Sequence, residues 1–113
     1  MSETNIFKST NDPSAIRERV VMVIKTVFDP EIPVNIWELG LIYRVDVDEK
    51  GEVEIDMTLT SPACPVAGSM PGEVQEKVAN VAGVNRVKLE LVWEPSWDPS
   101  KMSEAARITL GLF

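Results

Sequence analysis

One cysteine, Cys64, is the residue in this chain best suited to chemistry. It lies between Pro62 and Pro65, directly after a stretch of alternating apolar and polar residues that predicts a strand. Thiolates bind soft metals and act as nucleophiles, and a loop stiffened by prolines would hold such a group in place. The alternative interpretation is a small apolar side chain that merely fills space. Position alone leaves both interpretations open.

Two further sets of polar side chains could assist that thiol. Thr58 and Thr60 fall on the polar face of the expected strand and could hydrogen-bond the sulfur or a ligand, although threonine is also simply a favourable strand residue. Asp29 and Glu31 flank Pro30, and a carboxylate pair this close could ligate a hard metal or orient a thiol. The simpler interpretation of this pair is the end of a helix followed by solvated charge.

Composition excludes several kinds of site and partner. The chain has 113 residues with no histidine and one cysteine, so it can build no intrachain disulfide, Cys/His zinc site or histidine-dependent catalytic unit. Its 18 acidic and 11 basic side chains give a formal charge of -7, which disfavours nucleic acid and anionic membranes. We expect no signal peptide and no transmembrane segment. A single cysteine suits the reducing cytoplasm, where we expect the protein to work.

Hydrophobic periodicity predicts the elements that lead up to Cys64. Residues 1–11 are expected to form a flexible tail and residues 12–113 a single domain. Asp12 and Pro13 predict the start of an amphipathic helix that ends near Phe28. An apolar loop, a strand, a hairpin loop and a second strand should follow, over residues 29–40, 41–48, 49–51 and 53–60.

After Cys64 the pattern predicts a helix, a strand and a last short helix. The second helix should end at Gly83, but its start stays open, because Pro71 would kink a helix that began at Pro65. Ser69 or Met70 is the alternative start. A third strand should turn four apolar side chains to the core: Val87, Leu89, Leu91 and Trp93.

The last helix should be capped by Ser103, and the loop tryptophans Trp37 and Trp97 could either anchor a partner or cover the core.

The element order α-β-β-α-β-α predicts a two-layer α+β sandwich with a three-stranded sheet and helices on one face. A helical crossover between the second and third strands should make them parallel. Whether the third strand pairs with the first or the second remains open at this point.

Several motifs together resemble a known family, the SufT/PaaD-like iron–sulfur cluster assembly proteins. The resemblance runs from about residue 15 to the C-terminus, with the motifs in family order and spacing. The matching stretches are 29–31, 34–36, 39–43, 57–65, 83–84, 91–93, Pro95, Trp97, 102–104, 106–107 and 110–111.

This resemblance implies a small α+β fold similar to the NifU C-terminal domain, and a role in maturing iron–sulfur proteins. It implies that Cys64 is the reactive thiol and a possible cluster ligand, lined by Asp29, Glu31, Thr60 and Ser61. Ser61 stands where many members have threonine, which keeps a hydroxyl. The implied partners are Suf-type scaffold proteins and apo iron–sulfur clients. The apolar loop residues suggest a partner surface and leave a homodimer open.

A single thiolate cannot hold a cluster alone, because two-iron and four-iron clusters usually take four ligands. A transient cluster could be shared between chains or with a partner, or the protein could be an adaptor without a cluster. We expect a non-enzymatic assembly factor of the SufT branch. The alternatives are a PaaD-like partner of a multi-component oxygenase and a thiol redox enzyme, which the absence of a second cysteine disfavours.

Overall fold

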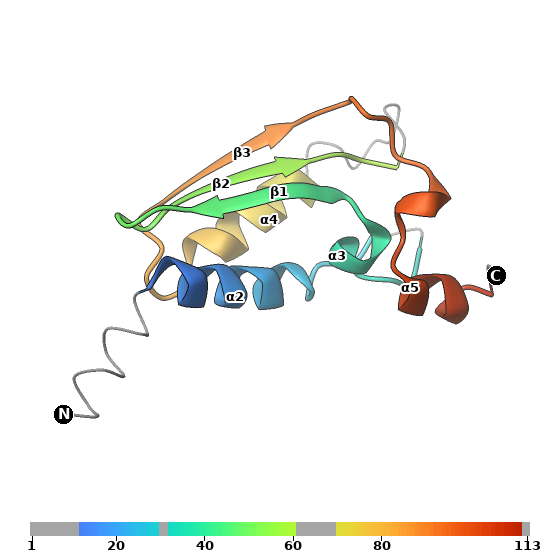
Figure 1. Ribbon diagram of the computed structural model, residues 1–113, viewed down its shortest axis with the longest axis horizontal. Helices are drawn as coiled ribbons and strands as arrows, with labels where there is room; N and C mark the ends of the chain where they lie inside the picture. The colour runs from blue at the N-terminus through green and yellow to red at the C-terminus, as the bar shows by residue number, and fades with distance from the viewer. Residues whose placement is uncertain (1–11, 30–31, 61–69, 112–113) are drawn as a thin grey trace.

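The fold is a three-stranded sheet with helices packed against one face, as seen in the computed structural model of Figure 1. The structure describes residues 12–29, 32–60 and 70–111, and the expected tail at 1–11 lies outside these ranges. The described elements are α2 (Pro13–Ile24), α3 (Ile36–Leu39), β1 (Ile42–Val47), β2 (Glu52–Met57), α4 (Met70–Ala79), β3 (Arg86–Leu91), the 3-10 helix η2 (Pro99–Lys101) and α5 (Glu104–Thr109). The α+β sandwich predicted from the sequence is confirmed.

Helix α2 begins as predicted and ends earlier than predicted. The Asp12 side chain accepts a hydrogen bond from the backbone N–H of Ser14 at 2.9 Å, and Pro13 is the first helical residue. The helix stops at Ile24 rather than near Phe28, although Val27 is fully buried. Apolar spacing predicted the longer helix because Val27 faces the core from a turn that follows the helix.

The loop expected over residues 29–40 contains a short helix, α3, that the sequence analysis missed. The Asn35 side chain caps it by accepting from the N–H of Glu38 at 2.9 Å. It ends at Gly40, which takes the left-handed conformation with φ +81°. One helical turn is too short to produce an amphipathic period, so only the Asn and Gly at its ends could have indicated it.

Strands β1 and β2 form the predicted hairpin. They pair antiparallel, with Val45 opposite Ile55 and Val47 opposite Val53. In the loop between them, the Asp48 side chain accepts from the backbone N–H groups of Lys50 at 2.8 Å and Glu52 at 3.0 Å. The hairpin loop is therefore fixed by contacts among its own residues, and the Gly51 carbonyl also accepts from the N–H of Asn85 at 2.7 Å.

Strand β2 lies in the middle of the sheet, which settles the strand order that the sequence left open. It pairs parallel with β3, in register from Glu52 with Arg86 to Met57 with Leu91, so the predicted parallel crossover is confirmed. Helix α4 makes this crossover and starts at Met70. This start agrees with the alternative predicted from the sequence, and Pro71 is the second residue, where the helix needs no backbone donor. The predicted end at Gly83 is wrong, because α4 ends at Ala79 and a turn follows it.

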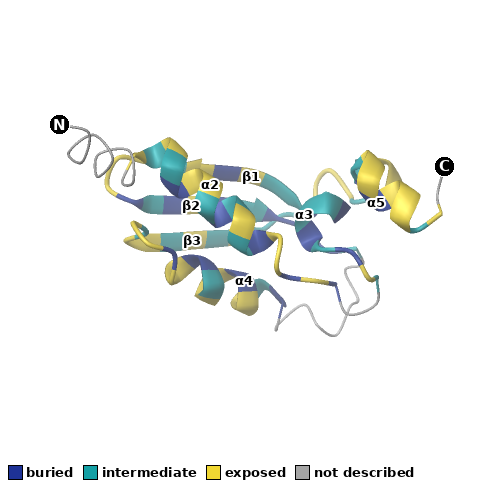
Figure 2. Cartoon of the chain, turned by 90° about the horizontal axis from the view of Figure 1, so that it is seen from below, coloured by how far each residue is buried: buried dark blue, intermediate teal, exposed yellow. Residues whose placement is uncertain are grey.

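The core lies between the sheet and helices α2 and α4 (Figure 2). Ile24, Leu41, Ile55 and Val78 are among its fully or almost fully buried side chains. Since each strand turns one set of alternate residues to this layer, the period-two patterns in the sequence correspond to the buried face. No helix in the described ranges is long and apolar enough to cross a membrane.

The opposite face of the sheet carries charge, and no described helix covers it (Figure 1). On this face Arg44 forms ion pairs with three carboxylates: Asp46, Glu54 and Asp56. The Arg44 side chain is 41% exposed, so these pairs are solvated and each contributes little to stability. The hydrogen bonds that the guanidinium donates to the three carboxylates raise its pKa above the usual range.

Candidate functional site

Residues 58–60 extend β2 toward Cys64 and carry the first described side chains of the candidate site. The backbone N–H of Thr58 donates to the carbonyl of Leu41 at 2.8 Å, and the backbone N–H of Val92 donates to the carbonyl of Met57 at 2.8 Å. The extension therefore runs between the start of β1 and the segment that follows β3. Cys64, Ser61 and Glu31 lie outside the described residues.

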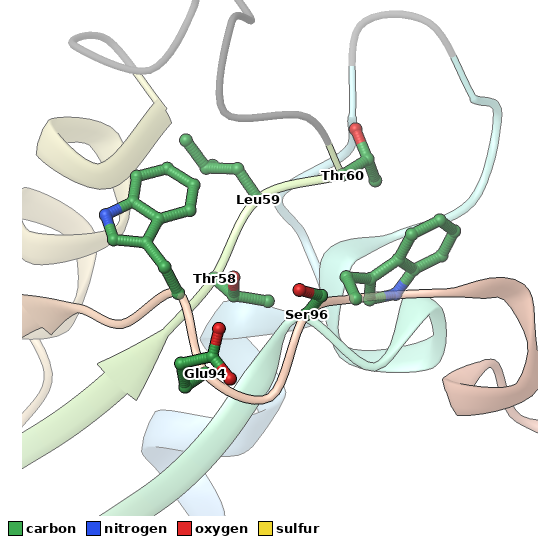
Figure 3. A pocket seen from close by; sticks show the side chains of 7 residues that line it. Thr58, Leu59, Thr60, Glu94 and Ser96 are labelled. Carbon is green, nitrogen blue, oxygen red and sulfur yellow. The ribbon is translucent and has the colours of Figure 1, made fainter.

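A cavity of about 260 Å³ opens beside this extension (Figure 3). One wall is the extension itself and the other is the segment after β3. The lining residues are Thr58, Leu59, Thr60, Trp93, Glu94, Ser96 and Trp97. Thr60 is partly buried and is the last described residue on the path to Cys64. The sequence-predicted role of Thr60 as a site-lining residue is therefore compatible with its position.

Thr58 and Trp93 lie differently from the sequence prediction. Thr58 is 1% exposed rather than on a solvated polar face, because the chain leaves the strand at Met57 and the alternation stops there. Trp93 is 43% exposed rather than packed in the core, because β3 ends at Leu91. Both side chains line the cavity as a result.

The segment that carries the second wall, residues 93–97, is held by long-range hydrogen bonds. The Tyr43 hydroxyl donates to the carbonyl of Pro95 at 2.8 Å. The indole Nε1–H of Trp97 donates to the carbonyl of Leu39 at 2.7 Å. Trp97 thus packs against the core while its ring borders the cavity. Of the two alternatives predicted from the sequence, anchoring a partner or covering the core, the structure shows the second.

Gly40 lets residues 98–103 approach this end of the sheet closely. A Cβ atom at Gly40 would lie 2.2 Å from the carbonyl oxygen of Lys101, far inside contact distance. The N–H of Ser103 donates to the carbonyl of Glu38 at 2.8 Å, and the Ser103 side chain caps α5 as predicted. The Lys101 ammonium lies 5.3 Å from the centre of the Tyr43 ring.

Tyr43 and Asp98 are the described titratable groups at this end whose pKa values depart from the ordinary ones, and hydrogen bonds from Ser100 lower the pKa of Asp98. Burial raises the pKa of the phenol, the negative charge of Asp98 raises it further, and a hydrogen bond with Thr58 opposes both. The phenol therefore stays protonated at neutral pH and keeps its bond to Pro95. Its role is to position the wall of the cavity.

Asp29 is 5% exposed and fixes the turn that follows α2. Its Oδ1 accepts from the backbone N–H of Ile32 at 3.2 Å, and Phe28 bridges to Asn35 across the loop. In Figure 1 this loop lies at the same end of the molecule as the extension of β2. Asp29 is absent from the described lining of the cavity, so the structure brings Thr60 but not Asp29 to that space.

The described residues contain no group of three histidine, cysteine, aspartate or glutamate side chains that could hold a metal ion. Glu94 and Ser96, which line the cavity, were missed by the sequence analysis. A strand end followed by Pro95 and flanked by two tryptophans was the signal that could have indicated a structured wall rather than a plain loop.

Comparison with known proteins gives consistent similarities. Residues 17–89 match a family model described as "Iron-sulfur cluster assembly protein". A protein of Porphyromonas gingivalis named "Fe-S protein maturation auxiliary factor" is 50% identical over 94 residues, which is 83% of this chain and 90% of that protein. The "Fe-S protein maturation auxiliary factor SufT" of Staphylococcus aureus is 38% identical over 86 residues, which is 76% of this chain and 98% of that protein.

A crystal structure of a domain of unknown function from Bacillus anthracis resembles the whole fold. It aligns with a TM-score of 0.82 and 37% identity, covering 89% of this chain and 96% of that one.

Proposed function

The chain belongs to the iron–sulfur cluster assembly protein family, and from this premise we propose that it is a maturation factor of the SufT type that works through Cys64. The observation that carries the proposal is the family match over residues 17–89, which includes β1, β2 and the first part of β3. Relatives named as maturation auxiliary factors support a role in delivering clusters rather than in catalysis.

Cys64 is the proposed working residue, with Thr60, Ser61, Asp29 and Glu31 around it. Two observations support this arrangement. Thr60 borders the cavity at the point where the chain continues toward Cys64. Asp29 is buried and fixes its loop at the same end of the molecule as the extension of β2.

The cluster is the cargo of the proposed function. The chain offers one cysteine and no histidine, whereas a two-iron or four-iron cluster usually takes four ligands. A cluster held by Cys64 therefore needs ligands from a second chain, a small thiol, a Suf-type scaffold or the apo-client. Such transfer suits a reducing cytoplasm, where the thiol remains free.

The test is to purify the protein without oxygen and to count iron and acid-labile sulfide per chain. We compare the native protein with Cys64→Ser, and we measure in parallel how fast each matures an apo four-iron client enzyme. We expect Cys64→Ser to keep its fold and to lose the stimulation of client maturation. Unchanged maturation by folded Cys64→Ser would overturn the role given to the thiol.

A relocated cysteine provides the matched control. Ala79 is exposed at the end of α4, away from the residues that line the cavity. The double variant Cys64→Ser/Ala79→Cys has one thiol per chain, as the native protein does. We expect it to remain inactive, because the proposal needs the thiol beside Thr60. Recovery of maturation in this variant would mean that any surface thiol suffices.

A further inference from the structure

The cavity beside Thr60 combines side chains that attract a cation. Two indole rings, Trp93 and Trp97, border it together with the carboxylate of Glu94 and the hydroxyl side chains of Thr60 and Ser96, while the buried Thr58 hydroxyl is bonded to Tyr43. No lysine or arginine is among its described lining residues. The faces of indole rings attract cations through their quadrupole, and carboxylate and hydroxyl oxygens accept hydrogen bonds from them.

Glu94 is exposed and forms no ion pair within the described part of the chain. Two of the described cations, one on β1 and one in η2, are engaged elsewhere. Arg44 pairs with Asp46, Glu54 and Asp56, and Lys101 lies over the Tyr43 ring. The negative charge at the cavity therefore remains available to a group from outside.

The size of the cavity favours one side chain over a free metabolite. Its volume of about 260 Å³ lies below the range of roughly 300–1,000 Å³ that is usual for small-molecule sites. In Figure 3, Glu94 and Ser96 lie on the segment in front of Thr58, while Thr60 lies farther along β2's extension. The lining side chains thus come from two segments, one on each side of the cavity.

We propose that this cavity accepts an arginine side chain from the protein partner to which the cluster is delivered. A guanidinium is planar, stacks on indole faces and donates in a fork that suits a carboxylate with neighbouring hydroxyls. The net charge of -7 favours a partner that presents basic residues. This inference rests on the proposed function, because it assigns to the space beside Thr60 a contact that would place the client near Cys64.

The three tryptophans allow a direct test by NMR. Trp93 and Trp97 border the cavity, whereas Trp37 lies in α3 and is not among its lining residues. The probe is the peptide acetyl-Gly-Arg-Gly-amide, and its control is the same peptide with citrulline, which keeps the shape and loses the charge. We follow the three indole N–H resonances, assigned with single Trp→Phe variants, in the full-length protein.

We expect the arginine peptide to shift the indole N–H resonances of Trp93 and Trp97 saturably and to leave the Trp37 resonance unchanged. The citrulline peptide should shift none of the three resonances. Glu94→Gln should weaken binding of the arginine peptide by about threefold to fivefold, as expected for the loss of one exposed charge pair. Glu90 is an exposed carboxylate on β3 that does not line the cavity. The Glu90→Gln variant should therefore bind the arginine peptide as the native protein does.

Equal responses to the two peptides, or equal binding by Glu94→Gln and Glu90→Gln, would overturn the inference. The peptide titration involves neither Cys64 nor a cluster. Its failure would therefore leave the maturation role intact, and loss of that role would be seen only in the Cys64→Ser experiment.

Discussion

The two ends of the three-stranded sheet are held together in different ways. At the hairpin end, the turn itself is held by local contacts: the Asp48 side chain accepts from residues two and four positions ahead of it, and the Gly51 N–H donates to the Asp48 carbonyl. One distant contact is added there, because the Gly51 carbonyl accepts from the N–H of Asn85 at 2.7 Å. At the site end, Tyr43 reaches Pro95 and Trp97 reaches Leu39, across 52 and 58 positions of sequence. A loop built from its own neighbours is specified by local sequence, whereas the cavity exists only when distant segments have docked.

The largest loss of stability should come from Gly40→Ala at the site end. Alanine at φ +81° is strained, and its Cβ would meet the Lys101 carbonyl at 2.2 Å. We expect a loss of about 3 kcal/mol in the free energy of unfolding, measured with urea and circular dichroism. Gly111→Ala is the control, because Gly111 has φ +75° with nothing within 4 Å of the added atom, and should cost only about 1 kcal/mol. Equal losses would show that the close approach to Lys101 contributes nothing.

Trp97→Phe should have the next largest effect. It keeps an aromatic ring and removes the hydrogen bond to Leu39, leaving a partly buried carbonyl without that donor. We expect a loss of about 1–2 kcal/mol in urea unfolding. Trp93→Phe, at a side chain that is 43% exposed, should stay within about 0.5 kcal/mol of the native protein. If the two variants were equally stable, the segment after β3 would not be held through Trp97.

Asp48→Ala tests the hairpin end by removing the acceptor for two backbone N–H groups. We expect a loss of about 1 kcal/mol in the free energy of unfolding. The fluorescence of the folded protein should not change, since Trp93 and Trp97 border the cavity at the opposite end of the sheet and Trp37 lies in α3. Glu49→Ala in the same loop should leave stability near the native value. A shifted emission spectrum in Asp48→Ala would contradict the independence of the two ends.

The smallest effect concerns pH. Burial and Asp98 raise the pKa of Tyr43 in the folded protein above that of the unfolded chain. Its contribution to stability is therefore complete below about pH 10 and is lost as the pH rises toward the higher folded value. Because Tyr43 is the only tyrosine, ultraviolet absorbance of tyrosinate reports this single group. Tyr43→Phe should lack this alkaline loss, and a tyrosinate titration identical in folded and unfolded protein would contradict the raised pKa.

The same contrast explains how far the sequence could be interpreted. Period-two patterns predicted all three strands, and Asp12 and Ser103 predicted their helix caps, because each signal acts within a few residues. The helix α3 and the end of α2 were missed, because Val27 and Ile36 are buried by tertiary packing that no local period shows.

The candidate site was predicted only in part. Cys64 and Thr60 could be singled out by residue type and by resemblance to a family. Glu94 and Ser96 could not, because they line a cavity only once β3 lies parallel to β2 and the segment after it has folded back. Cavities formed between segments distant in sequence leave no spacing pattern to detect.

The charged face of the sheet has a consequence for how the protein behaves in concentrated solution. Arg44 and its three carboxylate partners cover the centre of that face with charges of both signs that remain hydrated. Stacking two molecules through this face would strip water from all of these groups at once. A hydrated face of this kind therefore disfavours association between copies of the chain through it.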